Sequence, residues 1–156
     1  MFIKVLTIIF YIQSVMIAGC HSAQNKEASG DQLPVIIYNG ETQDLSDEKT
    51  IELSEKLDFI ATGCDDFYEL IVTSKLIEEL KNKEKYIEIV YPQPQSMSFG
   101  KFSEYELSRI FIPLSGKYAS SGQVTFFYGT ADYSNTPFSN SKGLDTLVPF
   151  LISIVH

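Results

Sequence analysis

Three short segments rich in β-branched and aromatic residues follow one another along the chain with no helical pattern between them. They are KYIEIVYP (residues 85–92), RIFIPL (109–114) and QVTFFYG (123–129). Their length and composition predict strands. Strands joined without an intervening helix favour antiparallel pairing in a meander. Because Pro113 cannot donate a hydrogen bond to a neighbouring strand, we expect the second segment at an edge of the sheet.

Helical patterns flank these strands on both sides. Apolar residues recur at helical spacing in three segments, 45–63, 74–83 and 143–155. Ser46 or Asp47 is suited to cap the start of the first helix and Gly63 to end it. Pro149 should kink or interrupt the last helix, because it lacks an amide proton.

Two further segments have strand character, PVIIYN (34–39) and FYELIVT (67–73). Together the segments predict an α+β fold, in which a mostly antiparallel sheet of about five strands has two or three helices packed on one face. Roughly 120 residues of this kind are enough to bury one core without metals or disulfides. We therefore expect a small single domain.

The first nineteen residues, MFIKVLTIIFYIQSVMIAG, have the pattern of a secretory leader. Lys4 precedes an apolar run, and small residues end the segment. Gln13 and Ser14 interrupt the run, which is too short to span a bilayer comfortably, since spanning takes about 20 apolar residues. A retained transmembrane helix is the alternative.

Directly after this leader, the sequence IAGC at residues 17–20 resembles the lipobox of bacterial lipoproteins. The resemblance implies transfer of diacylglycerol to the thiol of Cys20, cleavage before Cys20, and attachment to the membrane through acyl chains such as palmitate. Two or three chains make such attachment effectively permanent. In this family an aspartate after the cysteine tends to retain the protein in the inner membrane. His21 stands there instead and favours the outer membrane of a Gram-negative cell. The alternative is a buried or disulfide-forming cysteine that happens to follow a leader.

The domain organisation predicted from these patterns has three parts. Residues 1–19 are the signal peptide, residues 20–32 are the lipidated cysteine and a polar tether, and residues 33–156 are the globular domain. The formal net charge of −8 and the presence of one arginine, Arg109, argue against nucleic acid as a partner, because phosphate binding needs clustered basic residues.

Residues for catalysis are scarce. The two histidines, His21 and His156, lie in the tether and at the end of the chain, so no histidine-dependent site or zinc site is expected. Cys64 is predicted to be a buried structural residue, since the acidic pair after it would raise its thiol pKa. The string SDEK at residues 46–49 matches the S-x-x-K pattern of serine acyl-enzymes, but a helix cap explains the same letters.

The segment GTADYSNTPFSNSKG, residues 129–143, is the most distinctive loop of the chain. Its length exceeds that of most connections in compact domains. Aromatic residues among small polar ones are typical of an adaptable recognition surface. The candidate binding residues are Asp132, Tyr133, Asn135 and Phe138. The alternative is that both aromatic residues fold back onto the core and the polar residues only build turns.

A second candidate surface is residues 92–106, PQPQSMSFGKFSEYE, which could equally form a long hairpin with a covering loop.

These patterns favour a binding module over an enzyme. We expect a lipid-anchored bacterial envelope protein whose partner is another envelope protein, and an acidic surface would steer towards basic partners. The alternative is a carboxylate-dependent envelope hydrolase using acidic pairs such as Asp65 and Asp66 or Glu78 and Glu79. No cofactor and no metal is expected. A purely structural role in the envelope is a third hypothesis.

Overall fold

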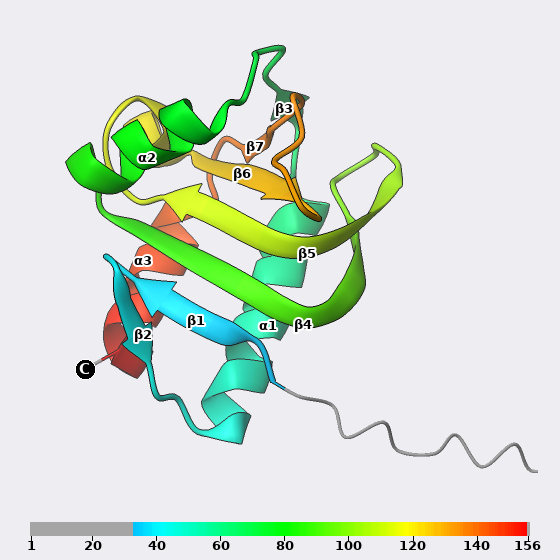
Figure 1. Cartoon of the computed structure of the whole chain (residues 1–156). Coiled ribbons are helices and arrows are strands. Elements are labelled where there is room, and N and C mark those ends of the chain that lie inside the picture. Colours follow the sequence, from blue (N-terminus) through cyan, green and yellow to red (C-terminus); the bar gives the residue numbers. More distant parts are fainter. Residues whose placement is uncertain (1–32, 156) are drawn as a thin grey trace, which may run out of the picture. The chain divides into compact units, whose positions relative to one another are not determined.

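The computed structural model describes residues 33–155, which form one small α+β domain (Figure 1). The three helices are α1 (Asp47–Thr62), α2 (Ser74–Lys83) and α3 (Leu144–Val155), and a short 3₁₀ segment covers Lys117–Gly122. The strands are β1 (Val35–Tyr38), β2 (Glu41–Gln43), β3 (Asp66–Phe67), β4 (Tyr86–Ser98), β5 (Glu104–Pro113), β6 (Val124–Gly129) and β7 (Phe138–Asn140).

The strands form one open antiparallel sheet in the order β2-β1-β4-β5-β6-β7-β3. The predicted class and the antiparallel meander β4-β5-β6 are confirmed, whereas the expected number of about five strands is too low. The additional strands β2, β3 and β7 are two or three residues long. Such short strands carry almost no periodicity, which is why the sequence pattern misses them.

Strand β5 is internal, so the prediction that Pro113 marks an edge strand is wrong. Pro113 is the last residue of β5 and lies opposite Tyr86, beyond the last residue pair that joins β5 to β6. The amide of Leu114 donates to the carbonyl of Lys85 at 2.7 Å. Because hydrogen-bonded and non-bonded pairs alternate along an antiparallel ladder, the nitrogen of Pro113 points away from β4. The proline therefore removes no hydrogen bond from that ladder.

The helices occupy the predicted segments. The hydroxyl oxygen of Ser46 accepts from the Lys49 amide at 3.4 Å, and α1 ends directly before Gly63, which confirms the predicted cap and stop. Helix α3 continues through Pro149, so the interruption that we expected at this residue does not occur. Pro149 is exposed, while Leu147 and Leu151 on either side of it are buried. Packing of these residues holds the helix together across the missing amide proton.

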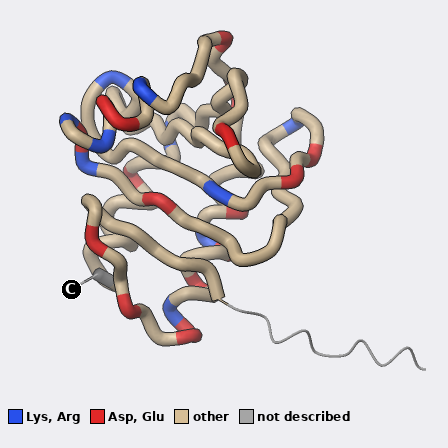
Figure 2. Tube along the Cα trace, in the orientation of Figure 1, with Lys and Arg blue, Asp and Glu red and all other residues tan. Residues whose placement is uncertain are grey.

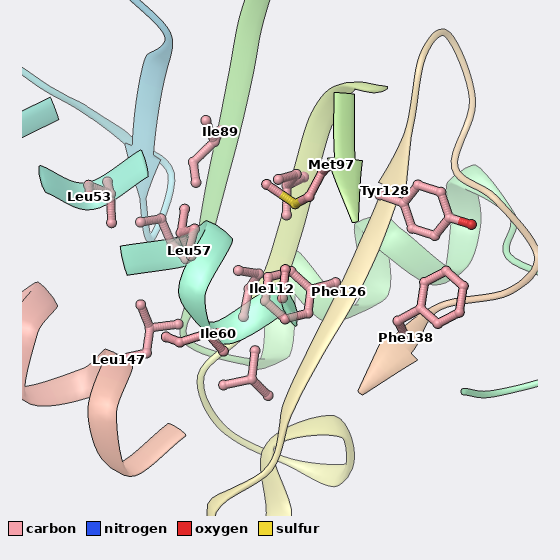
Figure 3. Close-up of a cluster of buried hydrophobic side chains, with 14 of the residues drawn as sticks. Leu53, Leu57, Ile60, Ile89, Met97, Ile112, Phe126, Tyr128, Phe138 and Leu147 are labelled. Carbon is pink, nitrogen blue, oxygen red and sulfur yellow. The ribbon is translucent and has the colours of Figure 1, made fainter. Parts of the chain in front are cut away.

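The main core lies between one face of the sheet and helices α1 and α3 (Figures 1 and 3). Leu53, Leu57 and Ile60 project from α1 and Leu147 from α3 towards strand residues such as Ile89, Ile112 and Phe126. All seven are at most 2% exposed.

The opposite face of the sheet is also covered, although the sequence pattern predicted helices on one face only. Ile77 and Leu80 of α2 pack against Tyr86, Phe111 and Phe127 from β4, β5 and β6. These strands carry apolar residues on both of their faces, so each face needs a cover. We call the face beneath α2 the outer face.

The predicted signal peptide, the lipobox with Cys20 and the tether lie outside the described residues. None of the helices between residues 33 and 155 combines the length and the apolar character that a membrane span requires.

Candidate functional site

The predicted recognition loop is folded more tightly than its composition suggests. Phe138 opens strand β7 and is 2% exposed, stacked on Phe99 and Tyr128 in the main core. Tyr133 is half-buried and returns to the sheet, where its backbone forms a bridge with Gly129. The structure therefore adopts the alternative in which both aromatic residues fold back. Of the four candidates, Asp132 and Asn135 are exposed.

Asn135 connects two segments that are far apart in the sequence. Its carbonyl accepts from the Leu70 amide at 3.4 Å, and its side-chain oxygen accepts from the Val72 amide at 2.8 Å. The Tyr68 amide donates to the carbonyl of Pro137 at 2.8 Å. These bonds continue the β3–β7 pairing beyond the two strands. We call the paired segments 67–73 and 133–137 the ridge.

The predicted strand at residues 67–73 is confirmed only for Phe67, which belongs to β3, yet its side chains alternate as in a strand. Tyr68, Leu70 and Val72 pack against the cluster beneath α2. Phe67, Glu69 and Ile71 are exposed, Phe67 by 40% and Ile71 by 79%. No other exposed large apolar side chain among residues 33–155 exceeds the exposure of Ile71.

Charged groups meet on the outer face beside Tyr133, the first residue of the ridge segment 133–137. Glu88, in the middle of β4, is 6% exposed and points to the outer face. Its Oε2 lies 2.7 Å from Nζ of Lys81 on α2, and its Oε1 accepts a hydrogen bond from the hydroxyl of Tyr133 at 2.9 Å. Both carboxylate oxygens therefore have a partner.

Tyr133 is the hydrogen-bond donor to Glu88. Burial, followed by the neighbouring charge of Glu88, raises the pKa of Tyr133 far above its usual range. The phenol therefore stays protonated, and its O–H donates a hydrogen bond to the carboxylate. The arrangement holds the loop onto the sheet and keeps Glu88 paired within the fold.

Arg109 lies on the other side of the Tyr133 ring. Its guanidinium carbon is 5.9 Å from the ring centroid. The Nε atom is buried without a hydrogen-bond partner, and Arg109 forms no ion pair within residues 33–155. A buried donor without a partner is rare in folded proteins. The outer face therefore holds one paired buried charge, Glu88, and one buried donor without a partner, Nε of Arg109.

Figure 2 shows the basic residues gathered mainly around α2, whereas acidic residues are spread over the domain. Lys81 in this group is committed to Glu88. The acidic residues of the suggested hydrolase pairs, Asp65 with Asp66 and Glu78 with Glu79, are all exposed. A hydrolase stays a prediction without support from this geometry.

The remaining candidates have structural roles in the described domain. Cys64 is 5% exposed, and burial, with the nearby charge of Asp65, raises the pKa of its thiol to about 12, as expected of a structural cysteine. Residues 92–106 form the long β4–β5 hairpin, with Met97 and Phe99 in the core. No group of three potential metal ligands occurs in the part of the chain that the structure describes.

A cleft of about 350 Å³ lies between α3 and the ends of β1 and β5. It is lined by Tyr38, Lys85, Leu114, Val148, Leu151 and Ile152. These side chains include no carboxylate, so the cleft offers no acid–base pair for hydrolysis.

Sequence reasoning missed Glu88, Lys81 and Arg109. Two signals were available: Glu88 interrupts the apolar run YIEIV, and Arg109 is the single arginine of the chain. Comparison with known proteins adds no residue, because no protein-family model, curated protein or solved structure matches the chain.

Proposed function

We propose that the chain is a lipid-anchored protein of the bacterial cell envelope and that its domain is a protein-binding module. The anchor is supported by the leader pattern and by the lipobox-like sequence that ends in Cys20. Acyl chains on Cys20 would hold the protein at the membrane, with the outer membrane as the site in a Gram-negative cell. The domain would then face other envelope proteins.

The observation that carries the binding proposal is the ridge. Its hydrogen bonds fix the backbone of residues 68–72, while Ile71 and Phe67 remain exposed to water. These two apolar side chains lie on the same side of one extended segment, with the exposed Glu69 between them. A surface that is ordered before binding loses little conformational entropy in the complex.

Charge indicates the chemistry of the partner. The chain carries a formal charge of −8, and Glu69 stands between the two apolar residues of the ridge. A protein with basic side chains around an apolar pocket complements this pattern, because opposite potentials steer association and fix the orientation of the partners.

The proposal keeps the predicted loop but changes the roles of its residues. Asn135 holds the two segments of the ridge together by accepting a hydrogen bond from the Val72 amide, and Tyr133 attaches the loop to the sheet by donating to Glu88. Phe138 belongs to the core. Asp132 remains available as an exposed acidic group at the turn before the ridge.

Site-specific photocrosslinking tests the ridge directly. The photoreactive residue p-benzoylphenylalanine would replace Ile71 in the full chain, expressed in cells of its source. Ile51, on α1 and 52% exposed, is the matched control position. We expect one protein adduct of defined mass from position 71 and none from position 51. A Glu69→Lys substitution should weaken that adduct, since it reverses the charge beside the apolar contact.

Two results would count against the ridge: no adduct from position 71, or the same adducts from both positions. The anchor has a separate test. A Cys20→Ser variant should no longer incorporate labelled palmitate and should leave the membrane fraction. Persistent labelling of that variant would disprove the lipobox interpretation without affecting the ridge.

A further inference from the structure

Four residues from neighbouring strands lie in one row across the outer face. Val35 of β1 is opposite Val90 of β4, Val90 is opposite Arg109 of β5, and Arg109 is opposite Gly129 of β6. Directly paired residues point to the same face of a sheet, with about 5 Å between strands. The guanidinium of Arg109 therefore has an apolar neighbour on one side.

On its other side, Arg109 lies next to Tyr133, because the loop after β6 folds back onto the sheet at Gly129. Gly129 has no side chain, and a Cβ atom there would lie 1.9 Å from the carbonyl oxygen of Asp132. The loop can therefore close onto the strand and bring the ring of Tyr133 to 5.9 Å from the guanidinium carbon. Arg109 is thus held between Val90 and an aromatic ring.

Glu88, the buried carboxylate of the outer face, forms no ion pair with Arg109. Both oxygens of Glu88 are occupied, one by Lys81 and the other by Tyr133. The donors of the guanidinium have no hydrogen-bond partner within residues 33–155, and its Nε is shielded from water. The terminal nitrogens of the guanidinium are not among the buried atoms without a partner, so an acceptor from outside the described residues can reach them.

We propose that Arg109 is the anchor of a binding site for a carboxylate attached to a small apolar group, as at the end of a peptide chain. The planar guanidinium fork matches a carboxylate through two parallel hydrogen bonds. Val35, which is 48% exposed, and Val90 offer the apolar surface beside it. A single positive charge matches a monoanion such as a carboxylate. The site shares Tyr133 with the ridge but does not involve its exposed residues Phe67, Glu69 and Ile71.

Nuclear magnetic resonance offers a specific test, because one arginine in the chain gives one Nε–Hε signal. The probe is N-acetylvaline, which carries a carboxylate next to an isopropyl group. We expect a saturable shift of the Arg109 signal and of the Val90 and Gly129 amides, with half-saturation on the order of 10 mM for two charge-assisted hydrogen bonds. N-acetylvalinamide, which lacks the charge, should cause no saturable shift.

Variants and a second anion separate the possible outcomes. Arg109→Lys keeps the charge but loses the planar fork, and should weaken N-acetylvaline binding at least tenfold on the amide signals while the spectrum stays that of a folded protein. The proposal is overturned if acid and amide act alike, if Arg109→Lys binds as well as the parent chain, or if inorganic phosphate binds more tightly than N-acetylvaline.

Discussion

The hydrogen bond between Tyr133 and Glu88 gives the sharpest test of the outer-face cluster, the group formed by Lys81, Glu88, Arg109 and Tyr133. Replacing Tyr133 with phenylalanine keeps the ring and its packing but removes the donor that lies 2.9 Å from Oε1 of Glu88. The side chain of Glu88 is 8% exposed, so water has little access to the oxygen that loses its partner. Hydrogen bonds to charged groups contribute about 1.5–3 kcal/mol. We therefore expect Tyr133→Phe to lower the free energy of unfolding by about 2 kcal/mol.

Urea unfolding followed by circular dichroism measures this difference by linear extrapolation. Tyr38→Phe is the matched control, because Tyr38 is half-buried and its hydroxyl makes no hydrogen bond within residues 33–155. The control should change the free energy of unfolding by less than about 0.5 kcal/mol. If Tyr133→Phe were no more destabilising than this control, the reasoning about the buried carboxylate would be refuted.

Three further predictions concern other parts of the domain. Gly129→Ala should lower the melting temperature clearly, because the new methyl group would lie 1.9 Å from the Asp132 carbonyl; an unchanged melting temperature would show that the turn is not as tight as described. Hydrogen bonds from the Ser141 side chain, and then from its amide, hold the pKa of Asp65 below its usual value, so this group stabilises the fold above about pH 4 and loses its contribution as the pH falls through the lowered pKa. An Asp65→Asn variant should accordingly lose less stability than the parent chain between about pH 5 and about pH 3. Equal losses in the two proteins would contradict the assignment. In a Cys20→Ser variant, Cys64 is the one thiol of the chain, and its raised pKa of about 12 and its burial predict that Ellman's reagent reacts with it at neutral pH only after unfolding.

The helices and the long strands were predictable because their signals are local. The apolar spacing around Leu53 and Leu57, the cap at Ser46 and the stop at Gly63 all lie within one segment and agree with one another. Local consistency of this kind is what specifies an element. Strand β7 lacked such a signal, because Phe138 is followed by polar residues that pair with distant β3. Its sequence therefore resembled a loop.

The outer-face cluster depended on contacts that a sequence pattern does not contain. The run YIEIV showed that Glu88 needs a partner, but not that Lys81 of the preceding helix and Tyr133 from a distant loop would supply it. Likewise, the composition of the recognition loop gave no means of telling an exposed Tyr133 from a buried one. The ridge arises from pairing between segments that are distant in the sequence.

Hydrogen exchange at the amides of the ridge tests most directly whether the proposed binding surface is ordered before any partner arrives. The structure predicts protection for Tyr68, Leu70 and Val72, whose amides donate to Pro137 and Asn135. The amides of Glu69 and Ile71 have no such acceptor within residues 33–155 and should exchange rapidly. Alternating protection along residues 68–72 in the free protein is the result we expect. Rapid exchange at all five amides would contradict a preformed ridge and remove the support for the proposed binding module.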